Sequence, residues 1–293
     1  MKPYLNDSNN PGVNAIVRSI FFWIIFIFLL YLSASLASSS LPPRWERFSF
    51  GICGSIVAFI TAWIFLKIEK RSFADIGLVW QRATIARFLK GILIGTAIFG
   101  FILIILLGFT ELRIERSTVS FKPWDAFWYL AIIPLAFMEE VAFRSYPFLK
   151  LNKVFGLRIT QVILAIAFAV YHIVLGWDEK IAFLGPGIWA FVFGLAAIWS
   201  GGIAVPTGIH VAINIIQPLI GMKSGNYQSL WKLDFKEGTP ADLIARADNI
   251  GLGTQVVILV VAAGLTEYYI RKGMDLAHKR SKRCRSFTGW KGS

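Results

Sequence analysis

The sequence predicts an all-α, polytopic membrane protein with about eight transmembrane helices, and three observations lead to this fold class. Residues of the AVILMFWYC set make up 56% of the 293-residue chain. Only 16% of the residues are charged, whereas a soluble domain has about 25%. The apolar residues also gather in eight long stretches. So few charges could not cover the surface of a soluble fold, and the composition therefore excludes secreted disulfide scaffolds, disordered chains and most soluble enzymes.

The eight stretches are each close to the length of about 20 residues that crosses a hydrocarbon core. They are residues 19–36, 50–66, 91–109, 126–149, 159–176, 181–199, 203–220 and 252–270. We expect them to form a single membrane domain over residues 1–293. Residues 34–37 have an A-x-A-like pattern typical of signal-peptide cleavage, but the first stretch is long enough to favour an uncleaved anchor. Only residues 200–202 separate the sixth stretch from the seventh.

The formal net charge of +13 is concentrated in three segments. Residues 67–90, residues 150–158 and the tail 271–293 are strongly basic, whereas the loops 110–125 and 221–251 balance bases and acids. Because cytoplasmic loops of membrane proteins are enriched in Lys and Arg, this alternation predicts that both termini lie in the cytoplasm. The basic excess is therefore a topology signal that could also favour anionic lipid at the tail, and we expect no nucleic-acid partner.

The loop after the second stretch and the two cysteines give two further expectations. Residues 67–90 mix six bases with apolar side chains, which is compatible with an interfacial helix on the inner leaflet and equally with a solvated connecting loop. Cys53 lies in an apolar stretch and Cys284 in the basic tail. Both are expected to be free thiols rather than a disulfide framework.

Three ionisable residues interrupt the fourth stretch, namely Glu139, Glu140 and Arg144. A charge at the centre of a membrane helix costs about 2.5–3.5 kcal/mol even on lenient scales, so these side chains are expected to face a polar intramembrane cavity. Glu140 and Arg144 are four residues apart and can form a salt bridge on one helix face. Glu139 lies about 100° away around the helix. It is left without an intrahelical cation and is a candidate general base.

Two of the three histidines also lie in apolar stretches. His172 follows Phe168 by four residues, and His210 precedes Asn214 by four. Each pair therefore shares one helix face, and Asn214 could hydrogen-bond one ring nitrogen of His210 and leave the other nitrogen to act. Either histidine alone could be a packing residue. Together with the glutamates of the fourth stretch they predict a chemical site, whereas His278 in the basic tail has no expected role.

These residues resemble the CPBP family, the CAAX proteases and bacteriocin-processing enzymes also called Abi. The resemblance is carried by three motifs on successive apolar stretches, over about residues 126–220. The motifs are Glu139-Glu140-x-x-x-Arg144, Phe168-x-x-x-His172 and His210-x-x-x-Asn214. The resemblance implies a core of this extent, eight or so spans, and a conical cavity open to the cytosolic side. It also implies an intramembrane endopeptidase of glutamic type that cleaves a membrane-associated or lipidated protein or peptide.

The resemblance also implies roles for the motif residues. Glu139 would activate a water for attack on a peptide carbonyl, and His172 would help position or deprotonate that water. His210 and Asn214 would stabilise the oxyanion. Glu140, Arg144 and Phe168 would be supporting residues, and no cofactor would be needed. A metal-dependent alternative has Glu139, His172 and His210 as zinc ligands, because His₂Glu is a known catalytic set, although the chain lacks the H-E-x-x-H motif.

The residues alone are also compatible with other functions. A proton-coupled transporter would also place Glu and His at membrane depth, although no inverted repeat is visible. A non-catalytic immunity or scaffold protein could keep the same residues for structure. The expected location is a bacterial inner membrane. The alternative is the endoplasmic reticulum, because a prenylated CAAX substrate presupposes a eukaryotic setting.

Overall fold

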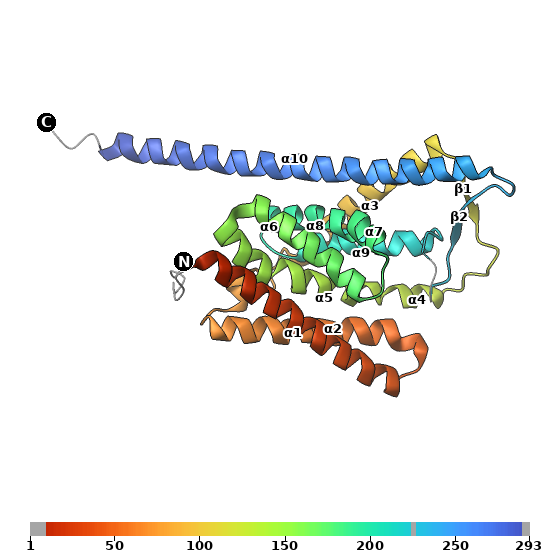
Figure 1. Cartoon of the computed structure of the whole chain (residues 1–293), viewed down its shortest axis with the longest axis horizontal. Coiled ribbons are helices and arrows are strands. Elements are labelled where there is room, and N and C mark those ends of the chain that lie inside the picture. The colour runs from red at the N-terminus through yellow and green to blue at the C-terminus, as the bar shows by residue number, and fades with distance from the viewer. Residues whose placement is uncertain (1–9, 224–226, 289–293) are drawn as a thin grey trace.

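The computed structural model describes residues 10–223 and 227–288. Helices dominate this part of the chain, which confirms the all-α prediction. Figure 1 shows the long helix α10 along one edge of the helical bundle, with the N- and C-terminal ends at the same end of the molecule. The elements in chain order are α1 (Pro11–Ser40), η1 (Pro43–Trp45), α2 (Glu46–Ile68), η2 (Phe73–Ile76), α3 (Thr84–Phe109), β1 (Leu112–Arg116), α4 (Asp125–Tyr129), α5 (Ile132–Arg144), α6 (Tyr146–Val174), α7 (Glu179–Ala182), η3 (Phe183–Gly187), α8 (Ile188–Ser200), α9 (Ala204–Leu219), β2 (Trp231–Phe235) and α10 (Ala241–Thr288).

Six helical segments are long and apolar enough to cross a membrane. They are Pro11–Ala37, Pro43–Ile68, Thr84–Phe109, Asp125–Val174, Glu179–Ser200 and Ala241–Met274. The predicted number of eight is not confirmed, for two reasons. The fourth and fifth predicted stretches share the 50-residue segment Asp125–Val174. The seventh corresponds to α9, whose 16 residues rise only about 24 Å in a hydrocarbon core of about 30 Å.

The segment that follows α2 is mainly a connecting loop. Within it the chain forms only the short helix η2, and α3 begins at Thr84. An interfacial helix over residues 67–90 is therefore not formed. Among the cysteines, Cys53 is free as predicted. The side chains of His278 and Cys284 lie outside the described residues.

A two-stranded antiparallel sheet joins two loops that are far apart in the sequence. In β1 and β2, Arg113 lies opposite Asp234 and Glu115 lies opposite Lys232. Opposite charges that face each other across strands stabilise the pairing. The composition gave no sign of these strands. They connect the two loops with balanced charge, which the alternation of basic loops had placed on one side of the membrane.

At the other end of the bundle, the carboxylate of Glu69 connects α1, α2 and α6. Its Oε1 accepts hydrogen bonds from Arg18 (2.7 Å), the Tyr146 hydroxyl (2.6 Å) and Lys150 (2.5 Å). Burial raises the pKa of Glu69, but the three donors outweigh it and hold the pKa below its ordinary value. The Tyr146 ring also stacks on Phe22 with centroids 5.6 Å apart. Polar and aromatic contacts therefore hold this end together.

Glycines allow α3 and α9 to approach each other closely. A Cβ on Gly91 would overlap the backbone oxygen of Val205, and a Cβ on Gly208 would overlap that of Phe88. Gly91 and Gly95 have the spacing of small residues that mediate close helix contacts in membranes. These glycines determine how deeply α9 sits in the bundle.

We predict that Gly208→Ala destabilises the protein. The new methyl group would meet backbone atoms of α3, which cannot move aside alone, and overpacking of this kind costs about 1–3 kcal/mol. Thermal unfolding in detergent measures the change. Gly100→Ala is the matched control, because a Cβ on Gly100 meets nothing within 4 Å. Equal unfolding midpoints for the two variants would contradict the close packing of α3 on α9.

Candidate active site

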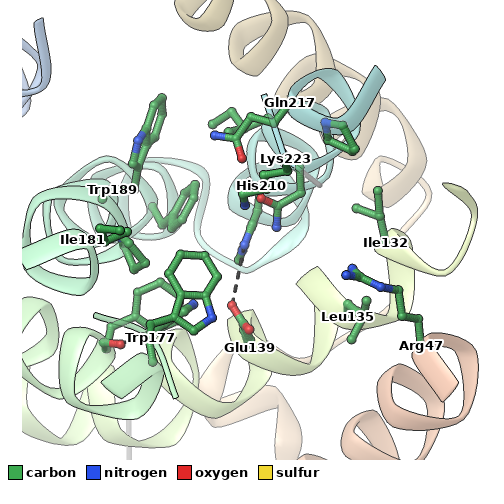
Figure 2. A pocket seen from close by; sticks show the side chains of 18 of the residues that line it. Arg47, Ile132, Leu135, Glu139, Trp177, Ile181, Trp189, His210, Gln217 and Lys223 are labelled. Atoms are coloured by element: carbon green, nitrogen blue, oxygen red, sulfur yellow. Dashed lines mark hydrogen bonds and ion pairs between the residues drawn. The ribbon is translucent and has the colours of Figure 1, made fainter. Parts of the chain in front are cut away.

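A cavity of about 330 Å³ brings together the residues that the motifs predicted. Glu139, His172, His210 and Asn214 all line it, and they come from three different helices, α5, α6 and α9. Figure 2 shows the Glu139 and His210 side chains pointing toward each other across this cavity. The remaining lining residues are Arg47, Ile132, Leu135, Phe168, Trp177, Ile181, Gly185, Pro186, Trp189, Phe193, Ile213, Gln217, Pro218, Lys223, Tyr227 and Gln255.

Beneath the cavity wall, Glu140 and Arg144 form the predicted ion pair of α5. Arg144 Nε lies 3.5 Å from Glu140 Oε2, and both side chains are fully buried. The guanidinium also lies over the Phe168 ring, 4.3 Å from its centroid, and 5.1 Å from that of Phe193. Arg144 is therefore held by one carboxylate and two aromatic faces. This contact explains why an aromatic residue stands at position 168.

The imidazole of His210 lies between the two glutamates. Its Nδ1 lies 2.9 Å from Glu140 Oε1, within hydrogen-bond distance. Its Nε2 lies 3.5 Å from Glu139 Oε2, which is longer than an ordinary hydrogen bond. The Phe193 ring stacks on the imidazole at 4.7 Å. The structure thus connects Arg144, Glu140, His210 and Glu139 in one continuous chain of charged and polar groups.

This arrangement corrects the expectation for Asn214. The spacing allowed Asn214 to hydrogen-bond a ring nitrogen of His210, but both nitrogens face carboxylates from α5 instead. An ionised carboxylate is a stronger acceptor than an amide, so Glu140 takes the role of orienting the ring. Asn214 keeps its place on the cavity wall.

His172 is oriented by its own helix. Its Nδ1 lies 2.8 Å from the carbonyl oxygen of Phe168. A carbonyl can only accept, so Nδ1 carries the proton and the neutral ring keeps Nε2 as an acceptor. The Trp177 ring packs edge-on against the imidazole at 4.9 Å. His172 therefore has a fixed tautomer and can accept a proton or a hydrogen bond at Nε2.

One oxygen of the Glu139 carboxylate is free to accept a hydrogen bond. Its Oε2 is buried and has no hydrogen-bond partner among the described residues, although it faces the His210 ring. A buried carboxylate oxygen is seldom left without a donor. Glu139 is thus able to accept a hydrogen bond from a small polar molecule in the cavity.

Two cations at the cavity wall were missed by the sequence reasoning. Arg47 comes from the first turn of α2 and Lys223 from the segment after α9, and Figure 2 shows both beside the cavity. Arg47 lies 4.6 Å from the Tyr227 ring centroid. Burial lowers the pKa of Lys223 to about 8. Neither residue belongs to an apolar stretch with a spacing motif, so the sequence carried no signal for them.

The described residues contain no group of three or more His, Cys, Asp or Glu side chains placed to hold a metal ion. Glu140 engages Nδ1 of His210, and the Phe168 carbonyl engages Nδ1 of His172. Both histidines therefore present Nε2 to the cavity.

Residues 121–216 match the family model of Rce1-like proteins, described as type II CAAX prenyl endopeptidase Rce1-like. The match covers about a third of the chain and spans α4 to nearly the end of α9. All seven predicted site and supporting residues fall inside it. No curated protein matched the chain. The family match confirms the resemblance to CAAX proteases and supports a protease embedded in a membrane.

We predict that Arg144→Met strongly destabilises the protein. The substitution leaves Glu140 buried without its cation, which costs about 3–5 kcal/mol, and it should loosen His210 as well. Unfolding in detergent measures the loss. Arg158→Met is the control, because it removes an exposed guanidinium from an ion pair with Glu267, and exposed pairs contribute about 1 kcal/mol or less. Comparable losses in both variants would contradict the importance of the buried pair.

Proposed function

We propose that this chain, whose residues 121–216 match the Rce1-like family model, is an intramembrane endopeptidase in which Glu139 activates a water molecule. The observation that carries this proposal is the Glu139 carboxylate at the cavity wall. It faces His210, which the buried Glu140–Arg144 pair holds in place. A general base of this kind contributes about 10²–10⁴-fold to a rate.

We propose that His210 is protonated in the resting enzyme. Its Nδ1–H then donates to Glu140 and its Nε2–H faces Glu139. The two carboxylates, the Arg144 guanidinium and the imidazolium would together carry no net charge. A neutral cluster suits a buried site, since an uncompensated ion there costs several kcal/mol.

In the first step, Glu139 takes a proton from water while the water oxygen bonds to the carbon of the scissile peptide carbonyl. The carbonyl oxygen becomes an oxyanion. Nε2–H of His210 and the side-chain amide of Asn214 would stabilise it, and one such donor is worth about 10²–10³ in kcat. Nε2 of His172 would accept a hydrogen bond from the attacking water and orient it.

In the second step, the carbon–nitrogen bond breaks. Glu139 returns its proton to the departing amine, which leaves a carboxylic acid on the other product. That acid then gives its proton to the amine, so the products are a carboxylate and an ammonium. Glu139 thus regains its ionised form, and atoms and charges balance without a cofactor. The supporting residues Glu140, Arg144 and Phe168 act by orienting His210 rather than by touching the substrate.

The substrate proposed here is a membrane-associated or lipidated protein or peptide. The lipid bilayer surrounds both enzyme and substrate, and no nucleic acid takes part. The proposed location is a bacterial inner membrane with both termini in the cytoplasm.

We predict that Glu139→Gln abolishes cleavage while the protein stays folded. An amide cannot take a proton from water at neutral pH, but it has nearly the same size as the carboxylate. The peptides in membranes containing the variant, compared by mass spectrometry with wild-type membranes, should lack the cleavage products. Glu179→Gln, which alters an exposed carboxylate of α7, should cleave normally.

The same comparison separates the competing functions. Full cleavage by Glu139→Gln would refute the proposed mechanism. Proton flux in proteoliposomes that depends on Glu139, without peptide cleavage, would indicate a transporter. A silent Glu139→Gln substitution in every assay would indicate an immunity or scaffold protein.

We also predict that metal chelators leave cleavage unchanged. A zinc site would need Glu139, His172 and His210 as ligands, whereas the mechanism above uses Glu139 as a proton acceptor. The assay is cleavage by the purified protein before and after treatment with a strong zinc chelator, with metal content measured in parallel. Loss of activity that stoichiometric zinc restores would contradict the metal-free mechanism.

A further inference from the structure

The cavity opens at one end of the bundle, where the β1–β2 sheet lies. Its wall there includes Arg47 at the start of α2, Trp177 just after α6, and Lys223 and Tyr227 after α9. Figure 1 shows β1 and β2 at the end opposite to the N- and C-terminal ends of the chain. The mouth therefore lies on the face that carries the sheet.

The opposite end is sealed beneath the catalytic residues. Every residue from 141 to 148 is buried, so the chain below Glu139 fills the space between the cavity and that end. A second cavity, of about 500 Å³, borders the 73–81 loop and residues 200–204, but none of the four predicted catalytic residues lines it. The lining residues of the cavity therefore show access to Glu139 from the sheet-bearing end.

The two ends differ sharply in charge. The segments at the sheet-bearing end contain ten bases and ten acids, whereas those at the other end contain seventeen bases and four acids among the described residues. The bases at the sheet-bearing end are Arg44, Arg47, Arg113, Arg116, Lys122, Lys180, Lys223, Lys232, Lys236 and Arg246, and the acids are Glu46, Glu111, Glu115, Asp125, Asp178, Glu179, Asp234, Glu237, Asp242 and Asp248. At the other end the bases are Arg18, Lys67, Lys70, Arg71, Arg82, Arg87, Lys90, Lys150, Lys153, Arg158, Arg271, Lys272, Lys279, Arg280, Lys282, Arg283 and Arg285, and the acids are Glu69, Asp75, Glu267 and Asp275.

From these observations we infer that the cavity opens to the extracytoplasmic face and that the substrate is the extracytoplasmic juxtamembrane segment of a membrane-anchored protein or peptide. Basic loops remain in the cytoplasm, which places the sheet-bearing end outside. This orientation is opposite to the cytosolic opening that the family resemblance implies. The substrate part of the inference rests on the proposed protease function, but the direction of access does not.

The depth of the site limits which bonds can be cut. Glu139 is seven residues from the start of α5 at Ile132, which corresponds to about 10 Å along the helix. A substrate must therefore bring its scissile bond about two helical turns below the outer end of α5. An anchored chain can do so where its membrane span meets the outer surface. A lipidated cysteine on a cytoplasmic protein would face the sealed end.

Cysteine accessibility tests the direction of access. In a background with Cys53→Ser and Cys284→Ser, single cysteines are placed at Gln217 inside the cavity and Lys223 at its mouth. Intact bacterial cells expressing each variant are treated with a membrane-impermeant maleimide, before and after permeabilisation. We expect both positions to react in intact cells.

Two exposed loop positions calibrate the assay. Lys236→Cys, after β2, should react in intact cells, and Arg82→Cys, before α3, should react only after permeabilisation. Reaction of Gln217→Cys and Lys223→Cys only after permeabilisation would overturn the inference. So would a cavity cysteine that reacts from neither side while Lys236→Cys reacts outside.

Labelling does not depend on catalysis, so it can be repeated in Glu139→Gln. External labelling together with full cleavage by Glu139→Gln would refute the proposed mechanism but not the direction of access. If both hold, the products lost in Glu139→Gln should map to segments outside the cytoplasm. Products that map to cytoplasmic segments would overturn the substrate class.

Discussion

The buried carboxylate of Glu140 is the interaction on which the site depends. One of its oxygens faces Arg144 four residues further along α5, and the other lies within hydrogen-bond distance of His210 on α9. It therefore neutralises a guanidinium and orients an imidazole at the same time. An isolated ion at this depth would cost several kcal/mol. The site is stable because each charge serves as the partner of another.

The packing of the helices follows from the same requirement. His210 reaches Glu140 only because α9 lies deep in the bundle, and Gly91 and Gly208 permit that depth by bringing the α3 and α9 backbones together. Phe168 and Phe193 then cover the guanidinium with aromatic faces. Apolar packing, which stabilises most of this protein, thus also fixes the distances between the few charged groups.

The sequence predicted the contacts within one helix and missed the contacts between helices. The Glu140–Arg144 pair follows from a spacing of four residues on one helix, and the structure contains it. The bond from Glu140 to His210 joins residues 70 positions apart, and helical periodicity cannot show it. For that reason Asn214 was expected to be the partner of His210. The pairing of β1 with β2 was missed for the same reason. The composition of two distant loops does not show that they pair as strands.

The predicted number of eight spans is not confirmed, for a different reason. Hydropathy locates apolar helices, but it does not tell whether each one crosses the bilayer, and α9 has only 16 residues. Most of α9 is buried within the protein. Its His210 is consequently out of contact with lipid and open to the cavity. Charged residues are scarce in this membrane protein, and they fall into two groups. The charges in the loops determine the orientation in the membrane, and the buried charges form the site. The inferred direction in which that site opens rests on the charges of the loops together with the residues at the mouth of the cavity.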